Sequence, residues 1–210
     1  MYKTTPAKKP LNIILLGDPA AGKATQSSIL IKRYPLVDFD MGRELNKRRQ
    51  ADKKLDSLLK FNTDKGKLTP TRVVRKILEE TISSTPQSKG ILFDGTPKML
   101  GEARLVASAL KKEGRSDPLV LYVSVPFSET MTRMRLRKGY FTGKFGKRPD
   151  DTDAALKNRV RYYRTNIAQV VNFFESKFKF KKISGVGTVR QVAQRLEVEI
   201  KKFQAHQTII

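Results

Sequence analysis

The chain has 210 residues, of which 39% are hydrophobic, enough for one globular domain with a buried core. It has no cysteine and one histidine, which excludes disulfides, cysteine–zinc sites and thiol nucleophiles and argues against a histidine-based triad. Lysine and arginine number 43 against 20 aspartate and glutamate residues, a formal net charge of +23. Any catalysis would therefore use carboxylates, cationic side chains, hydroxyls and backbone N–H groups, an inventory that suits phosphoryl transfer.

The positive charge predicts attraction to polyanions such as nucleotides, nucleic acids and anionic membranes. The alternative is that many of the lysines only solvate helix faces, because charged runs carry little specificity. The longest apolar run, residues 11–16, is far shorter than the roughly 20 residues of a membrane span, and residues 1–10 lack a signal-peptide pattern. We therefore expect a cytoplasmic protein without membrane attachment, and RNA stays open as a partner from charge alone.

The predicted elements alternate between strand and helix along the chain. Apolar runs of four to seven residues predict buried strands, and apolar residues at helical spacing predict helices. A threonine followed by proline, Thr69-Pro70, is typical of a helix start. In chain order we expect a disordered basic arm 1–10, strand 11–16, helix 22–32, a polar helix 43–60, a helix from residue 69, strand 90–94, helix 97–112, strand 119–125, helix 127–138, a loop or hairpin 139–149, helix 152–177, strand 178–183 and helix 189–203.

This alternation predicts an α/β fold with a central parallel sheet covered by helices on both faces. Ligands of such sheets bind at the carboxyl ends of the strands. Gly17, Asp94 and Pro126 follow three of the predicted strands, so we expect them to lie near the site.

A glycine-rich segment from Gly17 to Lys23 follows the first strand and precedes a helix, and it fits the first seven positions of G-x-x-x-x-G-K-[ST]. In this context backbone N–H groups and the helix N-terminus bind phosphate oxygens, and Lys23 adds a full charge. Ala24 stands where the general pattern has a hydroxyl residue. The alternative is a chance glycine-rich turn after a strand.

The segment around this loop resembles adenylate kinase and its nucleoside monophosphate kinase relatives, whose pattern is G-x-P-G-x-G-K-G-T-Q. Further resemblances follow in order over roughly residues 11–200. The matching segments are Gly17-Asp18-Pro19-Ala20-Ala21-Gly22-Lys23-Ala24-Thr25-Gln26, Asp94-Gly95-Thr96-Pro97-Lys98 for D-G-F-P-R, Val125-Pro126 with Arg133 and Arg137, and Arg148-Pro149-Asp150-Asp151 with Arg159. Ala20 and Ala24 replace two glycines of the family. If Ala20 has a positive φ, or its methyl group faces phosphate, nucleotide affinity should suffer.

The resemblance implies a P-loop NTPase-type three-layer α/β/α domain over residues 11–204, with a short tail 205–210. It also implies a small acceptor-binding helical insert, about residues 40–70, and a short zinc-free lid, about residues 139–150. A monomer is expected.

For the donor nucleotide, the resemblance implies that ATP is held by the loop and by two arginines. Arg133 would stack on the base, and Arg137 would reach the phosphates. The implied donor-binding residues are Gly17, Pro19, Ala20, Ala21, Gly22, Lys23, Ala24, Thr25, Arg133 and Arg137. The implied catalytic residues are Lys23, Lys98, Arg137, Arg148 and Arg159. Any one of these arginines could instead form a surface ion pair.

Asp94 is implied to hold Mg²⁺ through water molecules. The alternative role is a cap at the start of the helix that follows Pro97, and both roles are compatible. Arg43 replaces the family carboxylate that helps to organise the waters of the metal, which weakens the expectation of Mg²⁺ binding.

The acceptor side departs most from the family pattern. Asp40-Met41-Gly42-Arg43 stands for S-T-G-D, Asn46 replaces a phosphate-binding arginine, and Lys98 keeps a charge but loses the bidentate grip of arginine. The implied acceptor-binding residues are Met41, Gly42, Asn46, Lys67, Leu68, Thr69, Gly95, Lys98 and Glu102.

Glu102 stands where the family has a base-reading glutamine. A carboxylate only accepts hydrogen bonds, so it would suit guanine better than adenine. The alternative is a helix residue that faces solvent.

The implied activity is Mg²⁺-dependent transfer of the ATP γ-phosphoryl group, with AMP as the first candidate acceptor and GMP or a broad range as another. A second hypothesis is a catalytically weakened scaffold that binds RNA or a ribonucleoprotein through its basic surface. A nucleotide-dependent switch or transporter subunit is disfavoured by the size of the chain.

Overall fold

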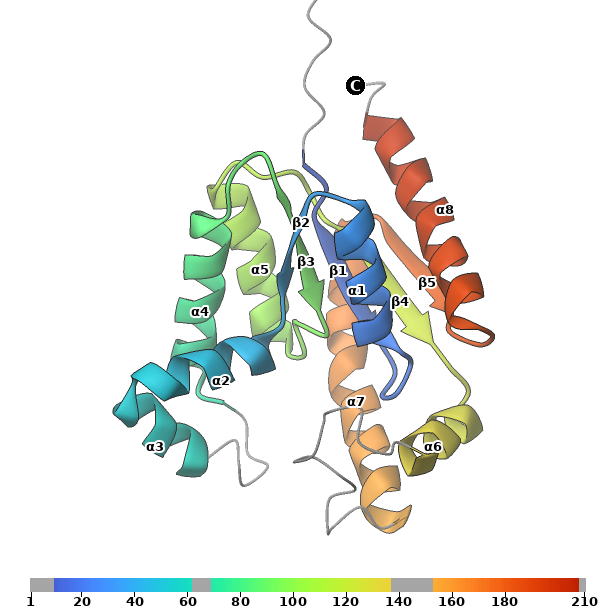
Figure 1. Ribbon diagram of the computed structural model, residues 1–210, viewed down its shortest axis with the longest axis horizontal. Coiled ribbons are helices and arrows are strands. Elements are labelled where there is room, and N and C mark those ends of the chain that lie inside the picture. Colours follow the sequence, from blue (N-terminus) through green and yellow to red (C-terminus); the bar gives the residue numbers. More distant parts are fainter. Residues whose placement is uncertain (1–9, 62–68, 137–152, 208–210) are drawn as a thin grey trace, which may run out of the picture.

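The computed structural model describes residues 10–61, 69–136 and 153–207. Five strands form one parallel sheet in the order β2-β3-β1-β4-β5, with β1 in the centre (Figure 1). Ile13 of β1 is in register with Leu92 of β3 on one side and with Leu119 of β4 on the other. The strands are β1 (Ile13–Gly17), β2 (Leu36–Phe39), β3 (Gly90–Asp94), β4 (Leu119–Ser124) and β5 (Phe180–Ser184).

Helices cover both faces of the sheet and give the three layers expected from the alternating pattern. One face packs against α1 and α8, and the other packs against α4, α5 and α7. The helices are α1 (Lys23–Arg33), α2 (Met41–Ala51), α3 (Lys53–Phe61), α4 (Thr71–Ser84), α5 (Leu100–Lys112), α6 (Phe127–Leu136), α7 (Asp153–Lys177) and α8 (Val189–Gln207). The predicted fold class is confirmed.

The central strand shows why the sheet needs both layers. Ile13 and Leu15 belong to the core under α1 and α8, whereas Ile14 and Leu16 belong to the core under α4, α5 and α7. Successive side chains of a strand point to opposite faces of the sheet. A strand that is apolar at every position therefore needs both faces of the sheet to be covered. All four side chains are at most 1% exposed.

Two predictions about the segment after α1 were wrong. Strand β2 was missed, because it has only four residues, is partly exposed and contains the polar Asp38. The single helix predicted over residues 43–60 is two helices that meet at Asp52. The Asp52 N–H closes α2 on the Arg48 carbonyl, and its side chain accepts hydrogen bonds from the N–H groups of Lys54 and Leu55 at the start of α3.

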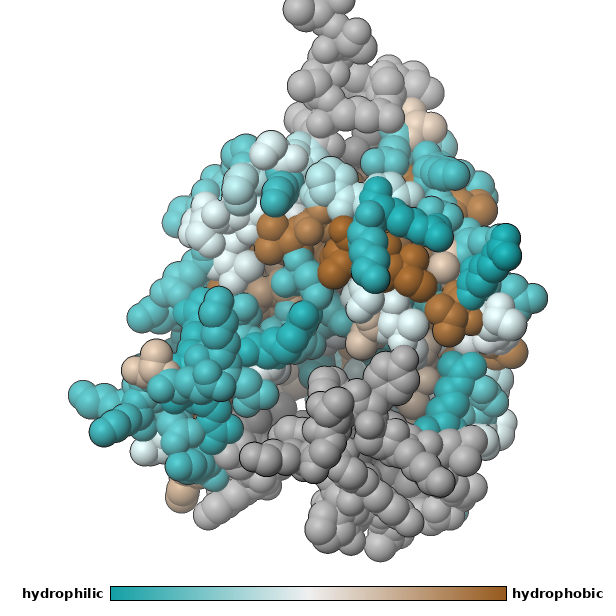
Figure 2. Space-filling view, in the orientation of Figure 1, coloured by the Kyte–Doolittle hydropathy of each residue, from teal (hydrophilic) through white to brown (hydrophobic). Residues whose placement is uncertain are grey.

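Helices α2 and α3 lie in the region predicted as the acceptor-binding insert and project from one side of the sheet (Figure 1). Hydrophilic side chains cover most of their visible surface (Figure 2). The insert and the domain limits stay predictions, and the predicted lid lies outside the described residues. In residues 10–61, 69–136 and 153–207, no helix is long and apolar enough to cross a membrane.

Candidate active site

The phosphate loop, residues 17–23, connects β1 to α1 at the carboxyl edge of the sheet. Gly17 lies so close to β4 that a Cβ atom there would come within 2.3 Å of the Val123 carbonyl oxygen. Gly22 caps α1 with a φ of 84°. Ala20 has a φ of 57°, in the left-handed region where glycine is favoured. The methyl group that replaces a glycine hydrogen at Ala20 therefore sits on a strained backbone.

Lys23 is the first residue of α1, and its side chain turns back over the loop. Its Nζ donates to the carbonyl oxygens of Gly17 at 2.8 Å and Asp18 at 3.0 Å. The Ala21 N–H donates to the Asp18 carbonyl at 3.1 Å, which closes the turn. Pro19 and Thr25 are half-buried, and Ala24 is exposed in the first turn of α1. The ammonium group, the loop and the start of the helix thus share one small region that is suited to an anion.

Asp94 and Gly95 lie beside Lys23, at the end of the neighbouring strand β3. A Cβ atom on Gly95 would be 3.6 Å from Lys23 Cε, and the Gly95 N–H donates to the Leu15 carbonyl. Asp94 is 7% exposed, and burial raises the pKa of its carboxyl, while the nearby Ser27 hydroxyl and the Lys23 charge act in the opposite direction. The carboxylate and the lysine predicted for the site therefore meet at adjacent strand ends.

Arg133 of α6 reaches the other side of the phosphate loop. Its guanidinium donates to the carbonyl oxygens of Gly185, at 3.1 Å, and Ala20, at 3.5 Å, and pairs with Glu129 at 2.7 Å. It therefore joins the loop to the segment between β5 and α8. Arg137 and Arg148 lie outside the described residues. Arg159 lies on α7, and its side chain is also outside them.

On the predicted acceptor side, Met41 and Gly42 begin α2, which Asp40 caps by accepting a hydrogen bond from the Arg43 N–H at 2.7 Å. The Arg43 guanidinium pairs with Asp38 at 2.6 Å, and this hydrogen bond raises the pKa of Arg43. Arg48 pairs with Glu44 and Glu80. The cations near Asn46 are thus partly engaged by carboxylates.

The rest of the predicted acceptor site follows β3. Glu102 accepts a hydrogen bond from the Lys98 N–H at 2.8 Å, in the first turn of α5. Asn46 and Lys98 are exposed and Thr69 is half-buried. Lys67 and Leu68 lie outside the described residues. Glu102 is half-buried rather than fully exposed to solvent, and its base-reading role stays a prediction.

The comparison with known proteins agrees with this geometry. A family model described as Adenylate kinase matches residues 15–179. The adenylate kinase of Bacteroides fragilis is 30% identical over 182 residues, 87% of this chain and 94% of the relative. That of Flavobacterium psychrophilum is 30% identical over 194 residues, 92% of this chain and 100% of the relative. That of Phocaeicola vulgatus is 28% identical over 193 residues, again 92% and 100%.

This chain belongs to the adenylate kinase family. The predicted resemblance is thereby confirmed, and so is the predicted class of enzyme, a nucleoside monophosphate kinase. The match begins within β1, at residue 15, and ends at residue 179, directly before β5.

A second group of residues near the loop of this adenylate kinase family member was not predicted. The buried Asp18 carboxylate accepts hydrogen bonds from the Tyr122 hydroxyl at 3.1 Å and the Val125 N–H at 3.0 Å, and it pairs with Arg164 at 3.4 Å. The Tyr163 hydroxyl donates to the Gly17 carbonyl at 2.8 Å. The one sign of this group in the sequence is Asp18 itself, an acidic residue at a variable position of the phosphate-loop pattern.

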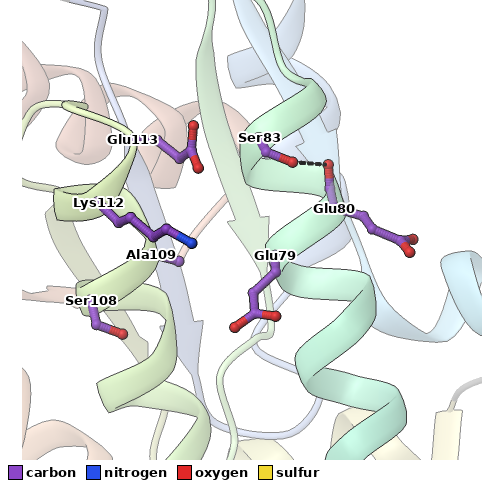
Figure 3. A pocket seen from close by; sticks show the side chains of 7 residues that line it. All are labelled: Glu79, Glu80, Ser83, Ser108, Ala109, Lys112 and Glu113. Carbon is purple, nitrogen blue, oxygen red and sulfur yellow. Dashed lines mark hydrogen bonds between the residues drawn. The ribbon is translucent and has the colours of Figure 1, made fainter.

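The cavity shown in Figure 3, of about 480 Å³, is distinct from this site. It lies between α4 and α5, where Glu79 points toward the side of α5 that carries Lys112 and Glu113, whereas the Glu80 side chain points away from α5. Glu79 and Glu113 bring two carboxylates against the one ammonium group of Lys112, which makes the cavity unfavourable for a phosphate. None of the residues that line this cavity belongs to the predicted nucleotide site.

Proposed function

We propose that this protein transfers the γ-phosphoryl group of ATP reversibly to a nucleoside monophosphate, with AMP as the preferred acceptor and two ADP molecules as the product. The observation that supports it most is the meeting of Lys23, Asp94–Gly95 and Arg133 around the phosphate loop. A phosphate oxygen of the acceptor attacks the γ-phosphorus atom, and the bond to the bridging oxygen of ADP breaks. Positioning and charge neutralisation carry most of such a reaction.

The donor half of the site supports ATP binding through the loop. Backbone N–H groups after Gly17 and the N-terminus of α1 bind the phosphates, and Lys23 exchanges its loop carbonyl partners for phosphate oxygens. The planar guanidinium of Arg133, between the loop and Gly185, suits stacking on the base. Arg137, Arg148 and Arg159 complete the proposed set by family resemblance.

The acceptor half supports a monophosphate more weakly. Lys98 is exposed at the start of α5 and supplies charge for the acceptor phosphate, while Asn46 offers an amide where the family has a guanidinium. Glu102 can still accept from a base with its second oxygen. GMP or a broad range of acceptors is therefore the alternative to AMP.

Magnesium is the cofactor that the family implies. In the described part of the chain, no group of three or more acidic, histidine or cysteine side chains could hold a metal ion. Mg²⁺ at phosphate sites usually needs only one or two carboxylates besides waters and substrate phosphates. Asp94 fits this role and would hold the ion through water. A bound ion would neutralise charge on the phosphate oxygens.

The activity is tested with purified protein, ATP, Mg²⁺ and each of AMP, GMP, CMP and UMP, following nucleoside diphosphate formation. We expect AMP to be the best acceptor and Lys23→Ala to lower the rate by about a hundredfold or more, because a charge on the phosphates is lost. Lys32→Ala, at an exposed lysine in the last turn of the same helix, is the matched control. A wild type that forms no diphosphate from any acceptor would refute the proposal.

The second candidate function is an RNA-binding scaffold, which the net charge of +23 favours. The same purified protein can be used to distinguish the two functions. An inactive wild type that binds RNA with a steep dependence on salt would favour the scaffold. An active wild type that loses its rate in Lys23→Ala would favour the kinase.

A further inference from the structure

The second residue of the phosphate loop, Asp18, carries a negative charge next to the proposed site of a triphosphate. Its side chain is only 6% exposed. Its backbone is part of the loop, because the Asp18 carbonyl accepts hydrogen bonds from Lys23 Nζ and from the Ala21 N–H. Like charges repel, most strongly where they are close together and water is excluded. An uncompensated carboxylate at this position would therefore oppose the binding of the phosphates.

The Asp18 carboxylate is turned toward the rear of the loop. There it accepts hydrogen bonds from the Tyr122 hydroxyl and from the Val125 N–H, at the end of β4. Burial raises the pKa of Tyr122, so this hydroxyl keeps its proton and donates. Both donors are neutral groups. They orient the carboxylate, and they leave its net charge in place.

Arg164 of α7 supplies the compensating charge. Its Nε lies 3.4 Å from Asp18 Oδ1, and its guanidinium lies over the Phe127 ring, 5.7 Å from the ring centroid. The preceding residue, Tyr163, donates its hydroxyl to the Gly17 carbonyl. Two consecutive residues of α7 thus contact two consecutive residues of the phosphate loop, and these contacts place the Arg164 side chain, which is 42% exposed, beside the buried Asp18 carboxylate.

We propose that Arg164 is a positioning residue for the donor nucleotide, which neutralises the Asp18 carboxylate behind the phosphate loop so that the loop can accept the phosphates of ATP. This inference rests on the proposed function in one respect, the binding of ATP phosphates at residues 17–23. The proposal adds the requirement for a cation behind the loop. The family pattern does not contain this requirement, because it arises from Asp18 in this chain.

The consequence is a specific coupling between two substitutions. Arg164→Gln should weaken ATP binding because it leaves the Asp18 charge uncompensated behind the loop that binds the phosphates. The same substitution in an Asp18→Asn background should have little effect, because no charge is left to compensate. A loss that is merely structural would weaken binding in both backgrounds.

The experiment measures the Kd for ATP by calorimetry, without acceptor, for the wild type, Arg164→Gln, Asp18→Asn and the double variant. We expect Arg164→Gln to weaken binding about tenfold in the wild-type background and about twofold or less in the Asp18→Asn background. The tenfold loss should shrink as salt is raised, because the repulsion is screened. Arg161→Gln, at an exposed arginine on the same helix, is the control and should bind ATP like the wild type.

Equal losses in the two backgrounds, or no loss in either, would overturn the role of Arg164. If Arg164→Gln fails to fold by circular dichroism, Arg164→Lys replaces it; this variant keeps the charge and should retain ATP binding within about threefold, and a larger loss also overturns the proposal. The proposed function fails in a different way. In that case the wild type does not bind ATP, or Lys23→Ala leaves the Kd unchanged.

Discussion

Two alanines stand in the phosphate-loop segment where the family pattern has glycine, and their backbones differ. Ala20 has a φ of 57°, whereas Ala24 lies in the first turn of α1. A left-handed conformation costs an L-residue with a Cβ atom about 1–2 kcal/mol, and glycine avoids that cost. Within a helix the preference is reversed, and alanine is favoured over glycine. Substitution by glycine should therefore change the stability of the protein in opposite directions at the two positions.

We predict that Ala20→Gly raises the free energy of unfolding by about 1 kcal/mol and tightens ATP binding. Ala24→Gly should lower the free energy of unfolding by about 0.5 kcal/mol, because it adds backbone freedom to the first turn of α1. Urea unfolding monitored by circular dichroism gives both values, and each variant serves as the control for the other. The same sign of change at both positions would contradict this account of the loop.

The residues of the candidate site could be proposed from the sequence only where they belong to a local pattern. Lys23 and Gly22 follow from the loop motif, and Asp94 follows from a carboxylate at a strand end. Asp18, Tyr122 and Arg164 form no local pattern, because they lie 104 and 42 residues apart in sequence and meet only through the order of the strands and the packing of α7. Such a cluster becomes visible only in three dimensions.

At the level of elements, the same contrast separates long buried strands from short or interrupted segments. β1, β3 and β4 are almost entirely buried and apolar up to their last residue, and they were predicted. β2 was not, because its edge position leaves Leu36, Val37 and Asp38 partly exposed. The division between α2 and α3 depends on Asp52, which ends one helix and caps the next. Most residues around Asp52 are polar, so one more polar residue does not break the pattern of apolar residues. The sequence therefore could not show where the first helix ends and the second begins.

A buried arginine joins three elements at the opposite end of the sheet from the phosphate loop. Arg115 is 8% exposed, and its guanidinium donates to the carbonyl oxygens of Ile82, Thr85 and Lys89. Two of these carbonyls lie at the C-terminal end of α4, where a positive charge is favoured by the helix dipole. Burial lowers the pKa of Arg115, and the nearby Glu113 acts in the opposite direction. The side chain thus ties α4 and the start of β3 to the segment before β4.

We predict that Arg115→Met lowers the free energy of unfolding by about 3 kcal/mol, because it leaves buried carbonyl groups without a donor. Phosphoryl transfer at a low temperature should change little, since Arg115 is far from the phosphate loop. Arg104→Met, at an exposed arginine of α5, should change the free energy of unfolding by less than about 0.5 kcal/mol. Urea unfolding of the three proteins checks the ranking, and equal effects of the two substitutions would contradict it.

The whole molecule combines a family fold with an unusually basic composition. The sheet order places the phosphate loop, the end of β3 and the segment after β4 at one edge, the carboxyl edge at which ligands of parallel sheets bind. The net charge of +23 is a separate property of the surface. It attracts anions and also adds repulsion within the folded state. Exposed ion pairs such as Lys202–Glu199 offset little of this, because each contributes at most about 1 kcal/mol.

The balance between repulsion and ion pairing sets the sign of the salt effect on stability. Salt weakens both the repulsion and the ion pairs. Because positively charged side chains exceed negatively charged ones by 23, screening should reduce the repulsion more than the attraction. We predict that the Tm of the protein without nucleotide rises as sodium chloride is increased from about 20 mM to about 500 mM. A falling Tm would show that the ion pairs outweigh the net charge.

A charge-reduced variant tests the cause. Lys179, Lys182 and Lys201 are exposed, before β5, on β5 and on α8, and their joint replacement by glutamine lowers the net charge by three without touching the proposed site. The variant should have a Tm about 2–4 °C above the wild type at low salt, equivalent to about 1 kcal/mol for a chain of this size. The two melting curves should converge at high salt, because the repulsion that distinguishes them is then screened within a few ångströms. A difference that persists at high salt would instead point to helix or strand propensity at the three positions.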